Sequence, residues 1–215
     1  MGWAMGIEGV SNIFWFPAQA SASMSGWIRY KDREIYFDHA PGYQDRNWGR
    51  SFPKWWTWLV SNQFQNSPGT VLAAGGGRPL ILNYLDVMDG MSIGLRHQGK
   101  FYEFRNTDGH SVQMEIRFGK WEVTATNPQG FKIVIHATAP RDKFMILPFQ
   151  TPQGPTFYDY EALRGHIEVS LSEKTGLFGL DWKEITHLST EEGGIEFGSG
   201  DLQEVEDFFG RSFQF

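Results

Sequence analysis

The sequence predicts an all-β protein, an antiparallel β-barrel or sandwich that ends in a short C-terminal helix. Short segments alternate between apolar and polar residues, glycine-containing turns separate them, and aromatic residues make up 16% of the chain. Alternation with a period of two predicts strands with one buried face, and aromatic residues favour strands. All-β domains often reach this length, so we expect one domain over residues 1–215.

Pairs of alternating segments around short turns predict successive β-hairpins. Two hairpins are expected at 26–37 and 92–104, around a polar turn and a Gln-Gly turn. Further strands are expected at 112–118, 121–126, 131–138 and 166–171. A meander of about eight or more strands predicts a lipocalin-like barrel or a sandwich, in which inward-pointing aromatic residues would enclose an apolar cavity.

The remaining segments receive separate interpretations. Residues 1–20 are expected to form a lead-in segment, and residues 200–212 an amphipathic helix. Four apolar side chains share one face of that helix: Leu202, Val205, Phe208 and Phe209. The glycine-rich run 72–79 (LAAGGGRP) matches neither a P-loop nor GxGxxG, so a bulge or tight bend between strands is expected there.

Composition and missing motifs exclude several classes of function. The net charge of -6 and the scattered Lys and Arg residues argue against nucleic-acid binding. The chain has no cysteine, no HExxH motif and no metal-ligand spacing among its six histidines, so we expect no metal site. A GxSxG elbow is absent, and no apolar run approaches the ~18 residues of a membrane-spanning helix.

The segment GYQDRNWGRSFPKWWTWLVSNQF, residues 42–64, places a carboxylate, a guanidinium and an amide directly before six aromatic residues. Strand alternation puts Trp56 and Trp58 on one face. Apolar surroundings raise the pKa of a carboxyl group such as Asp45, whereas the neighbouring Arg46 would lower it. The two residues are therefore either a structural ion pair or part of a site in which Asp45 acts as an acid. In the second case Asp45 should face a cavity lined by Trp48 and by Trp56 or Trp58.

The same segment resembles the tocopherol cyclase family. YQDRNWG at 43–49 and FPKWWTW at 52–58 match a Tyr-x-acid-basic-Asn-Trp-Gly motif and the aromatic strand that follows it. Weaker matches follow in order at GGGR 75–78, GKFYEF 99–104, GKW 119–121, AT 137–138, and Glu161 with Gly165. The family more often has Glu and Lys where this chain has Asp45 and Arg46, and residues 141–163 match poorly. Family members are usually longer, so the chain resembles their second, C-terminal half.

The resemblance implies an intramolecular lyase or isomerase of vitamin E biosynthesis that closes a prenylated hydroquinone into a chromanol after protonation of an alkene. No cofactor or metal is implied. A desolvated carboxylic acid can supply the proton, and aromatic faces stabilise a cation by about 0.5–2 kcal/mol each. The implied catalytic residues are Asp45, Arg46, Asn47 and Glu161. The implied substrate-binding residues are Tyr43, Trp48, Trp56, Trp58, Asn62 and Phe64.

Two other interpretations stay open. The first is a non-catalytic, lipocalin-like binder of a prenyl-quinone, carotenoid or pigment. The second is a subunit of a larger photosynthetic membrane assembly, which the apolar segment NIFWFP at 12–17 and the C-terminal helix favour. A hydrophobic small molecule is the expected ligand. A membrane surface, a protein complex, a separate N-terminal half and a second copy of the chain are alternative partners. The resemblance implies a plastid (chloroplast) or cyanobacterial thylakoid location.

Overall fold

The fold is almost entirely β. The computed structural model describes residues 7, 9–82, 84–86, 88–151, 154–176 and 179–201. Its elements, in chain order, are β1 (Ile13–Tyr30), β2 (Arg33–Gly49), β3 (Trp55–Ser61), β4 (Val71–Gly77), β5 (Gly90–His97), β6 (Lys100–Arg105), the short 3-10 turn η2 (Asn106–Asp108), β7 (Ser111–Arg117), β8 (Lys120–Thr126), β9 (Phe131–Thr138), the 3-10 turn η3 (Arg141–Lys143), β10 (Met145–Gln150), β11 (Thr156–Thr175) and β12 (Asp181–Ser199). The all-β prediction is confirmed. The predicted C-terminal helix lies outside the described residues.

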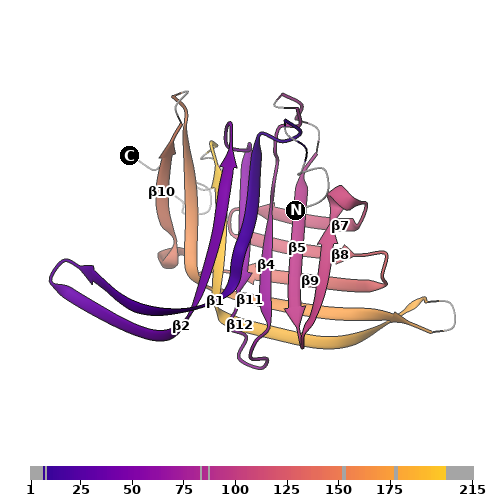
Figure 1. The fold of residues 1–215 in the computed structure, drawn as a ribbon. Helices are drawn as coiled ribbons and strands as arrows, with labels where there is room; N and C mark the ends of the chain where they lie inside the picture. Colours follow the sequence, from indigo (N-terminus) through magenta and orange to yellow (C-terminus); the bar gives the residue numbers. More distant parts are fainter. Residues whose placement is uncertain are drawn as a thin grey trace.

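Ten strands form one antiparallel sheet that curls into a nearly closed barrel (Figure 1). Its order is β6-β5-β4-β3-β12-β11-β9-β8-β7, so the two end strands β6 and β7 are consecutive in the chain. The long strands β11 and β12 serve two parts of the sheet. The first half of β11 pairs with β10, and its second half pairs with β9. Register shifts near Gly165 separate the two halves and allow the strands to bend.

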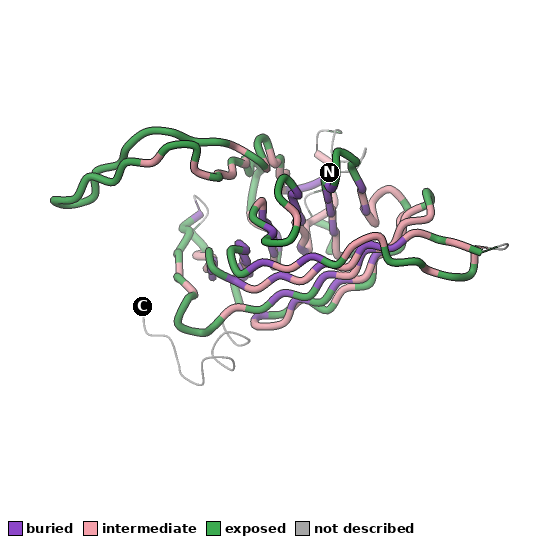
Figure 2. The backbone as a smooth tube through the Cα atoms, turned by 90° about the horizontal axis from the view of Figure 1, so that it is seen from below, coloured by how far each residue is buried: buried purple, intermediate pink, exposed green. Residues whose placement is uncertain are grey.

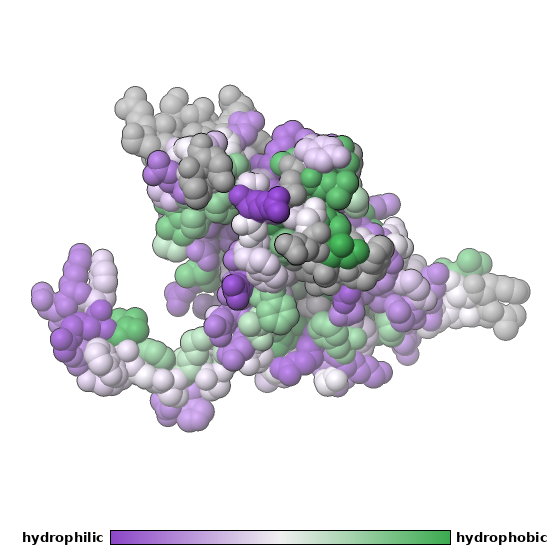
Figure 3. Space-filling view, turned by 45° about the horizontal axis from the view of Figure 1, so that its top comes forward, coloured by the Kyte–Doolittle hydropathy of each residue, from purple (hydrophilic) through white to green (hydrophobic). Residues whose placement is uncertain are grey.

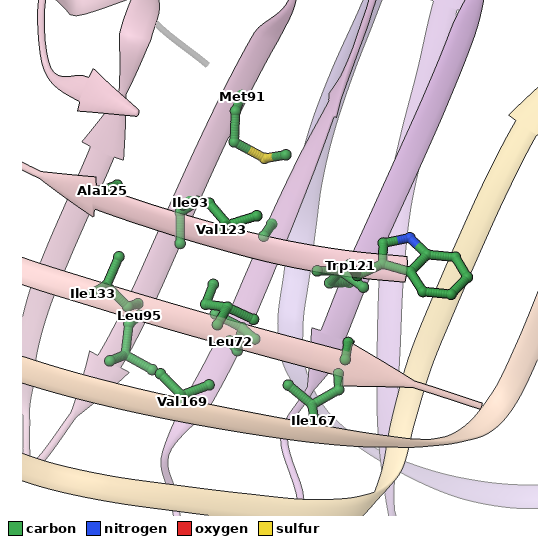
Figure 4. Close-up of a cluster of buried hydrophobic side chains, with 14 of the residues drawn as sticks. Leu72, Met91, Ile93, Leu95, Trp121, Val123, Ala125, Ile133, Ile167 and Val169 are labelled. Carbon is green, nitrogen blue, oxygen red and sulfur yellow. The ribbon is translucent and has the colours of Figure 1, made fainter. Parts of the chain in front are cut away.

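The inward-facing side chains form the hydrophobic core. Leu72, Ile93, Leu95, Trp121 and Val169 come from four different strands and belong to one buried cluster (Figure 4). The indole Nε1 of Trp121 donates a hydrogen bond of 2.9 Å to the hydroxyl of Thr57, so the buried polar atom has a partner. The sequence-based expectation of a ligand cavity within the barrel was wrong in its location. The cavity described below lies on the opposite, outer face of the sheet.

Strands β1 and β2 form a separate two-stranded sheet, a long hairpin whose base lies over the outer face of β4. The amide of Asn12 ties this base to the barrel, since it donates to the carbonyl of Phe52 at 2.9 Å and accepts from the backbone N–H of Leu80 at 2.7 Å. Asn62 at the end of β3 donates to the carbonyl of Gly42 at 2.8 Å. The predicted lead-in over residues 1–20 therefore contains the start of β1.

Beyond these ties the hairpin projects from the barrel as an arm, residues 22–40, that is exposed along most of its length (Figures 1 and 2). Hydrophilic residues gather toward the end of the arm beside a hydrophobic patch (Figure 3). Arg29 and Glu34 form an ion pair there. The structure thus divides the hairpin into a base that covers the barrel and an arm that does not.

The glycine-rich run is a strand, not the bulge or bend that the sequence suggested. Residues 71–77 form β4 and pair with β3 and β5 in regular register. Glycine is needed because neighbouring groups approach the backbone closely. A Cβ atom on Gly75 would lie 2.9 Å from the Trp15 ring, and one on Gly76 would lie 2.5 Å from the carbonyl of Gly90. The run therefore permits close packing on both faces of the sheet.

Candidate functional site

A cavity of about 480 Å³ lies between the outer face of the barrel and the base of the β1–β2 hairpin. Its volume falls in the range of about 300–1,000 Å³ that is typical of small-molecule sites. Aromatic residues supply much of its wall: Phe14, Trp15, Tyr43, Phe52, Trp56, Trp58 and Phe149. Four carboxyl groups line the same space: Asp45, Asp159, Glu161 and Glu196. An aromatic cavity with several carboxyl groups combines apolar binding surface with proton donors and acceptors.

Strand register explains why acids and indoles meet here. Glu161 on β11 pairs with Glu196 on β12, and Glu196 pairs in turn with Trp58 on β3. In the next outward-facing row, Asp159 pairs with Gly198, which pairs with Trp56. Residues directly opposite one another in antiparallel strands point to the same face. Two parallel rows of side chains therefore face the hairpin base.

Glycines make room for the indole rings. An added Cβ on Gly198 would overlap the ring of Trp56, and one on Gly194 would lie 2.5 Å from the ring of Trp58. Each indole therefore lies against the backbone of the neighbouring strand. This arrangement places broad aromatic faces along the cavity floor, and it would be lost with any larger residue at those positions.

Asp45 is held by a chain of hydrogen bonds from aromatic side chains. Its Oδ2 accepts from Nε1 of Trp15 at 2.6 Å and from the hydroxyl of Tyr43 at 3.0 Å. The Tyr43 oxygen in turn accepts from Nε1 of Trp58 at 3.1 Å. Burial raises the pKa of Tyr43, and the nearby Asp45 carboxylate adds to this effect, so the hydroxyl stays a donor. The carboxyl group is thereby fixed against the cavity wall.

The pKa values of Asp159, Glu161 and Glu196 are raised. Burial first, and then the charge of Glu161, raises the pKa of Asp159 to about 7. Burial also raises the pKa of Glu161, with Asp45 as a further cause. The pKa of Glu196 is raised well above its usual value by burial, Asp159 and Glu161, although the indole of Trp56 donates a hydrogen bond to it. Oδ1 of Asp159 is buried and has no hydrogen-bond partner among the residues that the structure describes. The cavity therefore contains three carboxyl groups that release their protons less readily than exposed carboxyl groups do.

Most of the residues predicted for the site come together around this cavity. Its lining includes six of them: Tyr43, Asp45, Asn47, Trp56, Trp58 and Glu161. Alternation along β2 and β3 accounts for this, because Tyr43, Asp45 and Asn47 share one face of β2, and Trp56 and Trp58 share one face of β3. The functional roles assigned to these residues stay predictions.

Four predicted residues lie elsewhere. Trp48 faces away from the cavity, is 45% exposed and stacks on Phe14, with the Arg46 guanidinium 5.5 Å above its ring. Alternation along β2 is the reason, since Arg46 and Trp48 take the face opposite to Asp45. In the described part of the chain no ion pair joins Asp45 to Arg46, which removes the structural-pair interpretation. Asn62 bonds to the hairpin backbone, and Phe64 belongs to the core.

Sequence reasoning missed Trp15, Asp159 and Glu196. Asp159 and Glu161 are two residues apart in a strand-like segment, so alternation alone could have placed both acids on one face. Glu196 lies between the apolar residues Ile195 and Phe197, which is a weaker signal of the same kind. The convergence of β1, β11 and β12 depends on long-range pairing, which no local pattern reveals.

Two further findings concern the described residues only. Within the described ranges, no group of three or more His, Asp or Glu side chains is arranged to hold a metal ion. No helix in that part of the chain is long and apolar enough to cross a membrane.

Comparison with known proteins gives a consistent result. A family model described as tocopherol cyclase-like matches residues 9–199. A probable chloroplastic tocopherol cyclase of Oryza sativa subsp. japonica is 34% identical over 116 residues, which are 53% of this chain and 24% of the rice protein. The chloroplastic tocopherol cyclase of Zea mays is 35% identical over 117 residues, again 53% of this chain and 24% of the relative. The matched part thus spans about a quarter of each relative.

Proposed function

The chain belongs to the tocopherol cyclase-like family, and we propose that it closes a prenylated hydroquinone into a chromanol by protonating the alkene next to the ring. One observation carries the proposal: the buried carboxyl group of Asp159, with a pKa raised to about 7, faces an aromatic cavity that contains three more carboxyl groups. A carboxylic acid with a pKa near neutrality is suited to general acid catalysis.

The reaction is an isomerisation in which one proton is gained and one is lost. Asp159 donates its proton to the alkene, which leaves a tertiary carbocation on the prenyl chain. The phenol oxygen bonds to this carbon and loses its proton to a carboxylate, for which Asp45 is placed on the opposite wall with fixed orientation. Proton exchange among the neighbouring carboxyl groups restores the starting state.

The aromatic walls have two roles in this scheme. The faces of Trp56 and Trp58 stabilise the developing cation, by about 0.5–2 kcal/mol each, and exclude water that would otherwise capture it. Asn47 lines the cavity beside Asp45 and is the candidate to orient a ring hydroxyl. Glu161, with its raised pKa, is a second candidate acid. Arg46 lies outside the cavity and is given no direct contact with the substrate.

The test is chromanol formation from a prenylated hydroquinone, followed by chromatography and mass spectrometry. We expect turnover by the wild type and a loss of about a hundredfold or more in Asp159→Asn, since general acids contribute about 10²–10⁴-fold. Ligand affinity should be nearly unchanged, because Asn preserves the shape of the side chain. Asp142→Asn, at an exposed position, is the matched control and should retain full activity.

Other outcomes have defined meanings. Full activity in Asp159→Asn combined with its loss in Asp45→Asn would assign the acid to Asp45. A wild type that binds the hydroquinone but forms no chromanol would favour the second candidate function, a non-catalytic binder of a prenyl-quinone, carotenoid or pigment. That alternative is supported by the limited match, which covers 24% of each relative. Apolar burial at about 25 cal/mol per Å² would suffice for binding without chemistry.

A plastid location is part of the proposal. Both relatives are described as chloroplastic. Association with thylakoid membranes is the finer expectation, and fractionation of plastids followed by immunodetection would test it.

A further inference from the structure

A second cavity, of about 420 Å³, lies beside the first and under the same hairpin. Pro17 and Ala20 of β1, Val71 and Ala73 of β4, and Phe101 of β6 contribute apolar surface to it. Trp15 and Ser92 line both cavities, so the two spaces adjoin at these residues. The outer face of the sheet therefore carries two adjoining compartments with different walls.

Trp15 stands at the boundary, and its position is fixed from two sides. The ring lies on the backbone of Gly75, where an added Cβ would come within 2.9 Å of it. Its Nε1 donates to Asp45 at 2.6 Å. One edge of the indole thus belongs to the acidic cavity, and the same ring forms part of the wall of the second cavity.

The two compartments differ in chemistry. The first cavity contains four carboxyl groups, whereas the second contains Arg96, Glu103 and Arg105. The guanidinium of Arg105 pairs with Glu103 and with Asp108, the latter at 2.8 Å, and Arg96 is exposed. The ring of Phe101 lies against Gly94, where an added Cβ would be 3.0 Å from it, so an aromatic side chain covers part of the floor. This compartment offers mainly apolar contact.

We propose that the second cavity receives the prenyl tail of a ligand whose ring lies in the acidic cavity, with the chain passing Trp15 and Ser92. The proposal rests on the proposed function for the identity of the ring, and it adds a site that selects for tail length. A molecule with a polar ring and a long apolar tail matches two adjoining compartments, one with four carboxyl groups and one with the apolar side chains named above. Apolar burial would supply about 0.8 kcal/mol for each buried CH₂ group.

Filling the second cavity tests this directly. Ala73 is buried on the outer face and lines the second cavity but not the first. We compare two quinones with the same ring, one with a single prenyl unit and one with four, by isothermal titration calorimetry. In Ala73→Phe the affinity for the long-tailed quinone should fall by about tenfold or more. The affinity for the short-tailed quinone should change by less than about twofold.

Ala40→Phe is the matched control, because Ala40 lies on the arm and lines neither cavity. It should leave both affinities unchanged. Equal losses for the two quinones in Ala73→Phe, or no loss for either, would overturn the proposal. Since the readout is affinity, it is independent of turnover: an inactive wild type that still prefers the long tail would contradict the cyclase and retain the tail site.

Photolabelling covers the case in which Ala73→Phe does not fold. A four-unit prenyl-quinone with a diazirine at the end of its tail is irradiated with the wild-type protein, and the modified residues are identified by mass spectrometry. We expect labels on Pro17, Ala20 or Phe101, which line the second cavity. Labels confined to the first cavity, to the barrel interior or to the arm would overturn the proposal.

Discussion

The two faces of β3 have separate tasks. Thr57 and Leu59 point inward, where Leu59 belongs to the core and Thr57 accepts the hydrogen bond of Trp121. Trp56 and Trp58 point outward and form part of the cavity. Because side chains alternate along a strand, one short segment can specify both packing and a site. Core packing and the lining of the cavity thus depend on different residues of the same strand.

The same division holds on β11 and β12. Tyr160, Ile195 and Phe197 are buried in the core. Their sequence neighbours Glu161 and Glu196 face the cavity instead. Ionisation of these buried acids, which lie opposite one another, destabilises the sheet. The outer face therefore carries groups that oppose stability, which is a common property of functional sites. Variants on the two faces should separate stability from activity.

The largest effect is expected on the inner face. Leu59→Ala removes a side chain that is 1% exposed, and such core truncations typically cost about 2–5 kcal/mol because they leave a cavity. Urea denaturation should show a reduced free energy of unfolding. Leu163→Ala, at a position that is 55% exposed, is the control and should change stability by about 0.5 kcal/mol or less. Equal effects of the two variants would contradict the assignment of the faces.

The carboxyl groups of the outer face should make stability fall as pH rises. Burial raises the pKa of Asp159 from 3.8 to about 7, so the folded state binds this proton more tightly than the unfolded state. The contribution of this proton to the free energy of unfolding is fully present below about pH 4 and is lost as the pH rises through about 7. One pKa unit corresponds to about 1.4 kcal/mol, so the loss amounts to a few kcal/mol.

Asp159→Asn should therefore lose less stability between pH 5 and pH 8 than the wild type does. Denaturation midpoints at the two pH values measure the difference. Some pH dependence of stability will persist in Asp159→Asn, since the pKa values of Glu161 and Glu196 are also raised. Asp142→Asn, at an exposed position, should follow the wild type. An identical pH dependence in Asp159→Asn and the wild type would contradict the buried, protonated state of Asp159.

A smaller effect is expected at Gly198, where the indole ring of Trp56 lies on the backbone. Gly198→Ala adds a Cβ that overlaps the Trp56 ring, and such overpacking typically costs about 1–3 kcal/mol. Displacement of Trp56 should also weaken binding of a prenyl-quinone, measured by calorimetry. Ser111→Ala, at an exposed position that does not line the cavity, is the control. Unchanged binding in Gly198→Ala would show that Trp56 does not contact the ligand.

The smallest effect is expected on the far side of β2. Arg46 is exposed and contacts Trp48 by a cation–π interaction worth about 0.5–1 kcal/mol at such sites. Arg46→Ala should therefore reduce stability by no more than this amount and leave turnover unchanged, whereas Asn47→Ala should reduce turnover. A strong loss of activity in Arg46→Ala alone would restore the catalytic role that the family motif implied.

Much of the fold could be predicted from local patterns. The hairpin at 92–104 and the strands around 112–138 have clear alternation and turn residues, and the structure contains them as β5 to β9. The glycine run at β4 was misjudged, because its conformation depends on Trp15 and Gly90, which approach from other strands. The outward position of the cavity depends on where the β1–β2 hairpin lies, and tertiary contacts alone determine this.

The site was predictable only in part. Motif and alternation together located Tyr43, Asp45 and the two outward tryptophans. The neighbours of Asp45 could not be inferred, since Asp159 and Glu196 reach the cavity through pairing of strands more than a hundred residues away in sequence. Burial, which raises the pKa values of these acids, is also a property of the folded state and has no local sequence signal.

The most direct test of the central claim is to locate the ring of a bound ligand. A prenyl-quinone with a diazirine on its ring is irradiated with the wild-type protein, with and without excess unlabelled quinone, and modified residues are identified by mass spectrometry. The outer-face site predicts competed labels on Tyr43, Trp56 or Trp58. Competed labels on Leu95, Trp121 or Val169 would instead place the ligand inside the barrel and contradict the account.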